Sequence, residues 1–161
     1  MSAIGRAAEG ETRVYFTGGA TAVLVGWRES TIDVDLKLVP ERDELLRALP
    51  QLKEELEINL ELASPADFIP VPAGWEERSP FVGREGEVSF HHFDLTSQAL
   101  SKIERGHAQD TADVAEMIAR GLVEPDTVRE HFRRIEPELY RFPAIDPAGF
   151  AGAVGCALGS G

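Results

Sequence analysis

The stretch from residue 14 to residue 39 constrains the fold of this chain more than any other, and it reads VYFTGGATAVLVGWRESTIDVDLKLV. A short apolar run breaks at a glycine pair, Gly18-Gly19, and small residues typical of a helix follow from Ala20 to Trp27. The last part alternates strictly between polar and apolar residues, which is typical of a strand with one face toward a core. The stretch therefore predicts a strand, a tight glycine turn, a helix and a second strand.

Two carboxylates project from one face of the second predicted strand. Asp33 and Asp35 are two residues apart, and side chains with that spacing lie about 6.7 Å from each other on a shared face. Like charges this close repel and add nothing to a core, so a solvated strand face is the plain interpretation. The glycine pair favours a second one. Backbone N–H groups at a helix N-terminus suit a phosphate, and paired carboxylates suit the Mg²⁺ that accompanies it.

The spacing of these residues resembles the signature of the nucleotidyltransferase superfamily that includes DNA polymerase beta: Gly18-Gly19, thirteen residues, then Asp33-x-Asp35. The letters GWRESTIDVD that end this motif are more narrowly similar to minimal bacterial nucleotidyltransferase-like domains, including the AbiEii-type abortive-infection toxins.

The resemblance implies an enzyme that transfers an NMP from a nucleoside triphosphate to an acceptor with Mg²⁺ or Mn²⁺. Asp33 and Asp35 would be catalytic metal ligands. The nucleotide would be bound by the glycine turn and the loop that follows, through Gly18, Gly19, Arg28 and Thr31.

A third carboxylate is expected beside the pair. Residues 57–63, EINLELA, alternate again and place Asn59 and Glu61 on one face. If this strand neighbours the one with the aspartates, Glu61 joins them, as a ligand of a second metal or as a general base. A polar residue on an exposed strand face is an equally good interpretation. Asp67 and Asp94 are rival candidates for the third carboxylate.

A second group of charged residues lies further along the chain. Lys102 on one predicted helix is followed by Asp110 and Asp113 at the start of the next. Helix-start aspartates and a surface lysine are the structural interpretation. AbiEii-like domains carry a lysine, an arginine and Asp-x-x-Asp in the order matched here by Lys102, Arg105, Asp110 and Asp113. That resemblance implies that Lys102 contacts phosphate and that Asp110 holds Lys102 in place. For Asp113 the structural interpretation is favoured.

Periodic apolar residues predict the remaining elements. A helix opens at residue 40, and Pro50 divides it in two. Residues 64–86 predict a long loop or small hairpin packed over the sheet, and residues 87–95 a further strand. Thr96 or Ser97 caps the helix after it. The following helix runs to about residue 120, with inward residues Ala112, Ala115, Met117 and Ile118. Further helices follow, and the final Gly-Ser-Gly is expected to fray.

The whole sequence predicts an α/β (α+β) fold, a small mixed sheet with flanking helices and a helical C-terminal half. At 161 residues a single domain is expected, with a core from 13 to 121 and a helical extension from 122 to 161. One cysteine permits no internal disulfide. The sequence has no apolar run of membrane-spanning length and no apolar signal core, which predicts a soluble cytoplasmic protein.

Partners remain open at this point. The net charge of −12 argues against broad nucleic-acid binding, although a local basic groove is compatible with it. The acceptor is RNA (tRNA included), a protein or a small molecule, and no membrane partner is expected. The chain is either an enzyme or a catalytically inactive binding or regulatory module. The enzyme could be the toxin of a toxin–antitoxin pair. An antitoxin or a second copy of the chain is then the expected protein partner.

Overall fold

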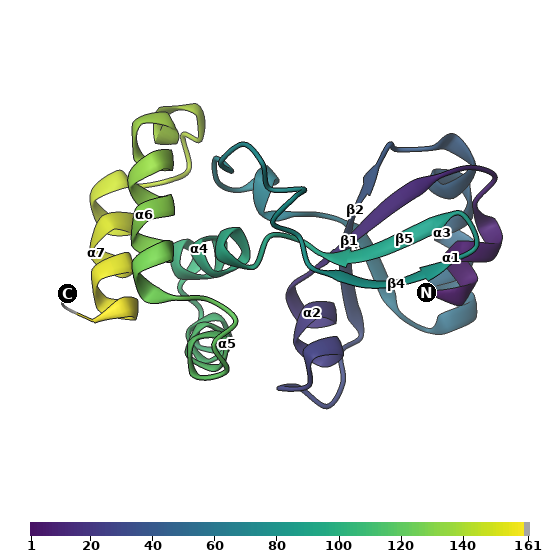
Figure 1. Cartoon of the computed structure of the whole chain (residues 1–161), viewed down its shortest axis with the longest axis horizontal. Helices are drawn as coiled ribbons and strands as arrows, with labels where there is room; N and C mark the ends of the chain where they lie inside the picture. The colour runs from purple at the N-terminus through teal and green to yellow at the C-terminus, as the bar shows by residue number, and fades with distance from the viewer. Residues whose placement is uncertain (160–161) are drawn as a thin grey trace. The chain divides into compact units, whose positions relative to one another are not determined.

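A computed structural model describes residues 1–159, which form two compact units (Figure 1). The first unit comprises residues 1–64 and 79–93, and the second comprises residues 65–78 and 94–159. The predicted fold class is confirmed, with a mixed sheet, flanking helices and a helical C-terminal half. No helix among residues 1–159 combines the length and the apolar character needed to cross a membrane.

The first unit is built on a five-stranded sheet in the order β3-β2-β1-β5-β4. β1 is antiparallel to β2 and parallel to β5, β2 is parallel to β3, and β4 is antiparallel to β5. The strands are β1 (Thr12–Thr17), β2 (Asp33–Val39), β3 (Asn59–Leu62), β4 (Phe81–Glu85) and β5 (Val88–His92). The helices are α1 (Ser2–Ala7), α2 (Gly18–Val25) and α3 (Asp43–Leu56).

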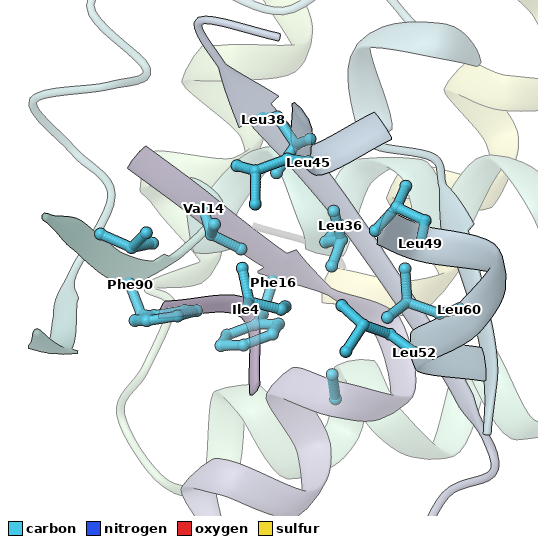
Figure 2. Close-up of a cluster of buried hydrophobic side chains, with 12 residues drawn as sticks. Ile4, Val14, Phe16, Leu36, Leu38, Leu45, Leu49, Leu52, Leu60 and Phe90 are labelled. Carbon is cyan, nitrogen blue, oxygen red and sulfur yellow. The ribbon is translucent and has the colours of Figure 1, made fainter. Parts of the chain in front are cut away.

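The core of the first unit lies on one face of this sheet, against α1 and α3 (Figure 2). Its strand residues alternate along β1, β2 and β5, as a half-buried sheet requires. The buried set includes Ile4, Val14, Phe16, Leu36, Leu38, Leu45, Leu49, Leu52, Leu60, Val88 and Phe90. Because alternate side chains point the other way, the carboxylates of β2 project from the opposite face.

Three details of this unit differ from the sequence predictions. Pro50 does not divide its helix: α3 is continuous and begins at Asp43, after Pro40. Pro50 is exposed, while Leu45, Leu49 and Leu52 of the same helix stay buried. The hydrogen bond that a proline cannot donate therefore leaves the packed face of the helix intact. The strand expected to reach residue 95 ends at His92. Part of the expected long loop forms β4, which pairs with β5 as a hairpin.

The second unit is helical. It contains η1 (Pro65–Asp67), α4 (Leu95–Arg105), α5 (Ala108–Ala119), α6 (Pro125–Ile135), η2 (Glu136–Arg141) and α7 (Pro147–Leu158). α4 packs against α5, α6 and α7. Phe132 of α6 meets Phe150 of α7 edge to face, with ring centroids 4.9 Å apart. The frayed Gly-Ser-Gly end predicted from the sequence lies mostly outside the described residues.

Two predictions for these helices are wrong. Thr96 and Ser97 lie inside α4, and its N-cap is Asp94, which accepts a 2.7 Å hydrogen bond from Ser97 Oγ. In α5 the predicted inward residues Ala112 and Ala115 are exposed. The buried residues of α5 are Asp110, Asp113, Val114 and Met117, because its buried face carries a pair of charges as well as apolar side chains.

Candidate functional site

The glycine pair forms a corner at the point where β1 ends. The helix predicted from Ala20 already begins at Gly18, so both glycines belong to α2. Gly18 has φ +58°, in the left-handed region that glycine adopts without steric cost. A β-carbon at Gly18 would lie 3.1 Å from Asp35 Oδ2. The corner therefore lies directly against one of the two predicted metal ligands.

The loop after α2 folds back onto the same corner. A β-carbon at Gly19 would lie 2.5 Å from Thr31 Oγ1 and 3.2 Å from a terminal nitrogen of Arg28. Thr31 Oγ1 donates to the Asp33 carbonyl at 2.9 Å and accepts from the Asp33 amide at 3.2 Å. These contacts bring Gly19, Arg28 and Thr31 together at the start of β2.

The two strands that carry the candidate carboxylates, β2 and β3, are neighbours in the sheet. β3 pairs with β2, which is the condition that the sequence set for Glu61 to join the aspartates. In the parallel register Asp33 lies beside Asn59 and Asp35 lies beside Glu61, while Thr17 lies opposite Asp35 on β1. Asp33 and Glu61 are exposed and Asp35 is half-buried. Three carboxylates thus occur at neighbouring positions of one sheet face.

An asparagine connects two of them. Asn59 Nδ2 donates to Asp33 Oδ1 at 3.0 Å and to Glu61 Oε1 at 3.1 Å. The alternation of residues 57–63 predicted that Asn59 lies on the same face as Glu61. The alternation gave no reason to assign a role to Asn59.

Asp94 and Asp67, the rival third carboxylates, belong to the second unit. Asp94 is buried and accepts from Arg78 Nε at 3.2 Å and from an Arg78 terminal nitrogen at 3.0 Å. Arg78 also donates to two carbonyls of its own loop, so this pair fastens residues 72–78 to the start of α4. Of the three candidates, Glu61 is the one on a strand paired with β2.

Lys102 and Asp110 also lie in the second unit, in a buried cluster of charges. Lys102 Nζ is 2.6 Å from Asp113 Oδ2 and 3.4 Å from Asp110 Oδ1. Arg105 donates twice to Asp110, at 2.9 Å and 2.5 Å. Lys102 has only 6% of its side chain exposed, so the interpretation as a surface lysine is wrong. Its predicted phosphate contact stays a prediction.

The two cations set the charge state of Asp110. Burial pushes its pKa upward, but the hydrogen bonds and charges of Arg105 and Lys102 outweigh burial and hold the pKa of Asp110 below its ordinary value. Asp110 is therefore an ionised carboxylate at neutral pH.

Comparison with known protein families shows which family this chain belongs to. Residues 4–140 match the model of a family described as nucleotidyltransferases of unknown function (DUF6036). The chain belongs to this family. The matched range holds the glycine corner, the three carboxylates and the Lys102 cluster. Comparisons with curated proteins and with solved structures gave no match.

Membership in this family confirms the relationship to nucleotidyltransferases that the glycine and aspartate spacing predicted. The narrower resemblance to AbiEii-type domains stays a prediction.

The donor set beside the glycine corner fits a hard divalent cation. Asp33, Asp35 and Glu61 offer carboxylate oxygens, and Mg²⁺ is usually held by one or two carboxylates plus water and phosphate oxygens. Within residues 1–159 no three His, Cys, Asp or Glu side chains converge as a complete metal cluster. Asp33 and Asp35 could thus hold a cation together with ligands from a bound triphosphate.

His92 lies behind the corner and makes structural contacts. It is adjacent to His91 on β5, so the two side chains point to opposite faces of the sheet. Thr21 Oγ1 donates to the Phe16 carbonyl at 3.1 Å, so it accepts from His92 Nδ1, also at 3.1 Å. Burial lowers the pKa of His92, which keeps its ring neutral at pH 7. This hydrogen-bonded chain ties β5 to α2 directly behind the glycine corner.

Proposed function

We propose that this chain is an Mg²⁺- or Mn²⁺-dependent enzyme that transfers an NMP from a nucleoside triphosphate to a hydroxyl group of an acceptor. The observation that carries the proposal is the approach of Gly18 to Asp35, because it puts a helix N-terminus and a carboxylate pair at one place. Membership in a nucleotidyltransferase family supports the same class of reaction.

Each residue has a defined part in this proposal. The amides of Gly18 and Gly19, with Arg28 and Thr31, bind the phosphates. Asp33 and Asp35 hold the cation, which when bound neutralises phosphate charge and polarises the reacting phosphoryl group.

The acceptor oxygen forms a bond to the α-phosphorus, and the bond between the α-phosphorus and its bridging oxygen breaks. Pyrophosphate leaves with the bonding electron pair, and the carboxylate of Glu61 takes the hydroxyl proton. The ammonium group of Lys102 is paired with Asp113 at 2.6 Å. A phosphate contact by Lys102 therefore requires this pair to break.

Calorimetry with an unreactive α,β-methylene triphosphate and Mg²⁺ tests the proposal. We expect the wild type to bind, and Asp33→Asn or Asp35→Asn to lose at least about 10-fold in affinity, because each removes a charged ligand of the cation. Asp43→Asn is the matched control, since Asp43 is an exposed aspartate of the same unit. Equal binding by the wild type and both site variants would contradict the proposal.

A second candidate is a non-catalytic member of the family that serves as a binding or regulatory module. The net charge of −12 and the small size of the chain suit it. It requires nucleotide binding, if any, to be insensitive to substitution of Asp33 and Asp35, so the same titration separates the two candidates.

The toxin role is a biological setting for the proposed activity and comes from the AbiEii resemblance. It requires that expression of the wild type arrests growth and that Asp35→Asn abolishes the arrest.

A further inference from the structure

We infer that Asn59 is a positioning residue of the proposed active site: its amide group holds Asp33 and Glu61 in place before any cation binds. This inference rests on the proposed function for its consequence, but its geometry can be tested separately.

The first step is the direction of the amide. One nitrogen, Asn59 Nδ2, lies 3.0 Å from Asp33 Oδ1 and 3.1 Å from Glu61 Oε1. A primary amide nitrogen carries two hydrogens, which is one for each carboxylate, whereas its oxygen is an acceptor that carboxylates would repel. The NH₂ group must therefore face the two acids, and both of its hydrogens are used there.

The second step is the backbone that fixes Asn59. It lies on β3 beside Asp33 in the parallel register, and its backbone amide donates to the Ile32 carbonyl at 2.6 Å. Asn59 and Glu61 are two residues apart on one strand face, so the side chain of Asn59 lies between the other two. The ladder thus sets the position of the amide, and the amide sets one oxygen of each acid.

The third step is electrostatic. Carboxylates on neighbouring positions of a sheet repel each other, and without a cation this repulsion spreads the side chains into solvent. A shared donor offsets part of the repulsion and holds one oxygen of each side chain at the amide. Each acid keeps its second oxygen for other partners. In metal sites, residues that orient the ligands in this way typically contribute about 10- to 100-fold to metal affinity.

The contact itself can be observed by NMR. Asn59 is the sole asparagine of the chain, so protein labelled with ¹⁵N only at asparagine gives a single side-chain NH₂ signal pair. We expect one proton of the pair to shift in Asp33→Ala and the other in Glu61→Ala, because in each variant that proton loses its acceptor. Asp43→Ala, on α3, should leave both unchanged. A pair that responds to neither site variant would overturn the inference.

The positioning role is tested by titrating Mg²⁺ in the presence of the unreactive triphosphate. Asn59→Ala should weaken Mg²⁺ binding about 10-fold. Gln51→Ala is the matched control, because Gln51 makes the same kind of bond, from its amide to Glu55 at 2.6 Å on α3. Equal Mg²⁺ affinity in Asn59→Ala and the wild type would overturn the role.

The two experiments separate the failure of this inference from failure of the proposed function. If the wild type binds Mg²⁺ but the NH₂ signals of Asn59 respond to neither site variant, the inference about Asn59 is wrong and the proposed function stands. A responsive pair in a wild type that binds no Mg²⁺ removes the proposed function, and the positioning role with it, while the hydrogen bonds remain.

Discussion

Single residues decide how close the elements of the first unit approach one another. Gly19 is the sharpest case, because a β-carbon there would overlap Thr31 Oγ1 at 2.5 Å. The sequence identified Gly18, Gly19, Arg28 and Thr31 as a group through a resemblance. It did not reveal that Gly19 is sterically required, since Thr31 is twelve residues further along and the contact exists only in the fold.

Substitution of Gly19 should therefore cost more than an ordinary surface change. We expect Gly19→Ala to lower the free energy of unfolding by about 1–3 kcal/mol, because Thr31 or the backbone must move to admit the methyl group. Gly83→Ala is the matched control: its site is open, with nothing within 4 Å of the added carbon, and the expected change is within about 0.5 kcal/mol. Urea unfolding measures both, and equal effects would contradict the account.

At the scale of elements, the sequence predicted the existence of nearly every strand and helix but not always the buried face. The alternation of residues 31–38 and 57–63 gave β2 and β3 correctly, because one side of a sheet is apolar and the other polar. The predicted buried face of α5 was wrong for a physical reason. This helix buries Asp110 and Asp113 with Lys102, and a rule that places apolar residues inward cannot find a buried ion cluster.

The buried cluster gives a stability prediction for α4 and α5. Asp113→Ala should destabilise the protein by about 3–5 kcal/mol, because it leaves Lys102 buried without its 2.6 Å partner. Asp126→Ala removes an ion pair with Arg129 of similar length, 2.7 Å, from an aspartate whose side chain is 98% exposed. That control should cost about 1 kcal/mol or less. Chemical denaturation compares the two, and a small loss in Asp113→Ala would count against a structural role.

The same cluster predicts a dependence on acid. The pKa of Asp110 is lower in the folded protein than in the unfolded chain, so its contribution to stability is complete above the unfolded value, near about 4. It is lost as the pH falls through the lower, folded pKa. We expect the free energy of unfolding to fall less steeply between about pH 5 and pH 2 in Asp110→Asn than in the wild type.

Asp43→Asn is the control for that comparison and should keep the wild-type slope, because Asp43 is exposed and lies 3.7 Å from its partner Arg47. An unchanged slope in Asp110→Asn would show that another group causes the acid sensitivity.

At the scale of the whole molecule, composition and periodicity were sufficient for the fold class. They could not reveal that the chain crosses between its two units three times, with residues 65–78 belonging to the helical unit. That assignment depends on long-range contacts such as Arg78 with Asp94, which no local pattern contains. The family relationship was accessible from a short motif because glycine and aspartate spacing is set by local strand and turn geometry.

The most direct test of the central claim is a crystal structure with a nucleoside triphosphate and Mn²⁺, in which anomalous scattering locates the metal. The account predicts a metal about 2 Å from carboxylate oxygens of Asp33 and Asp35, and triphosphate oxygens at the amides of Gly18 and Gly19. A metal bound elsewhere, or a triphosphate that leaves the glycine corner empty, would contradict it.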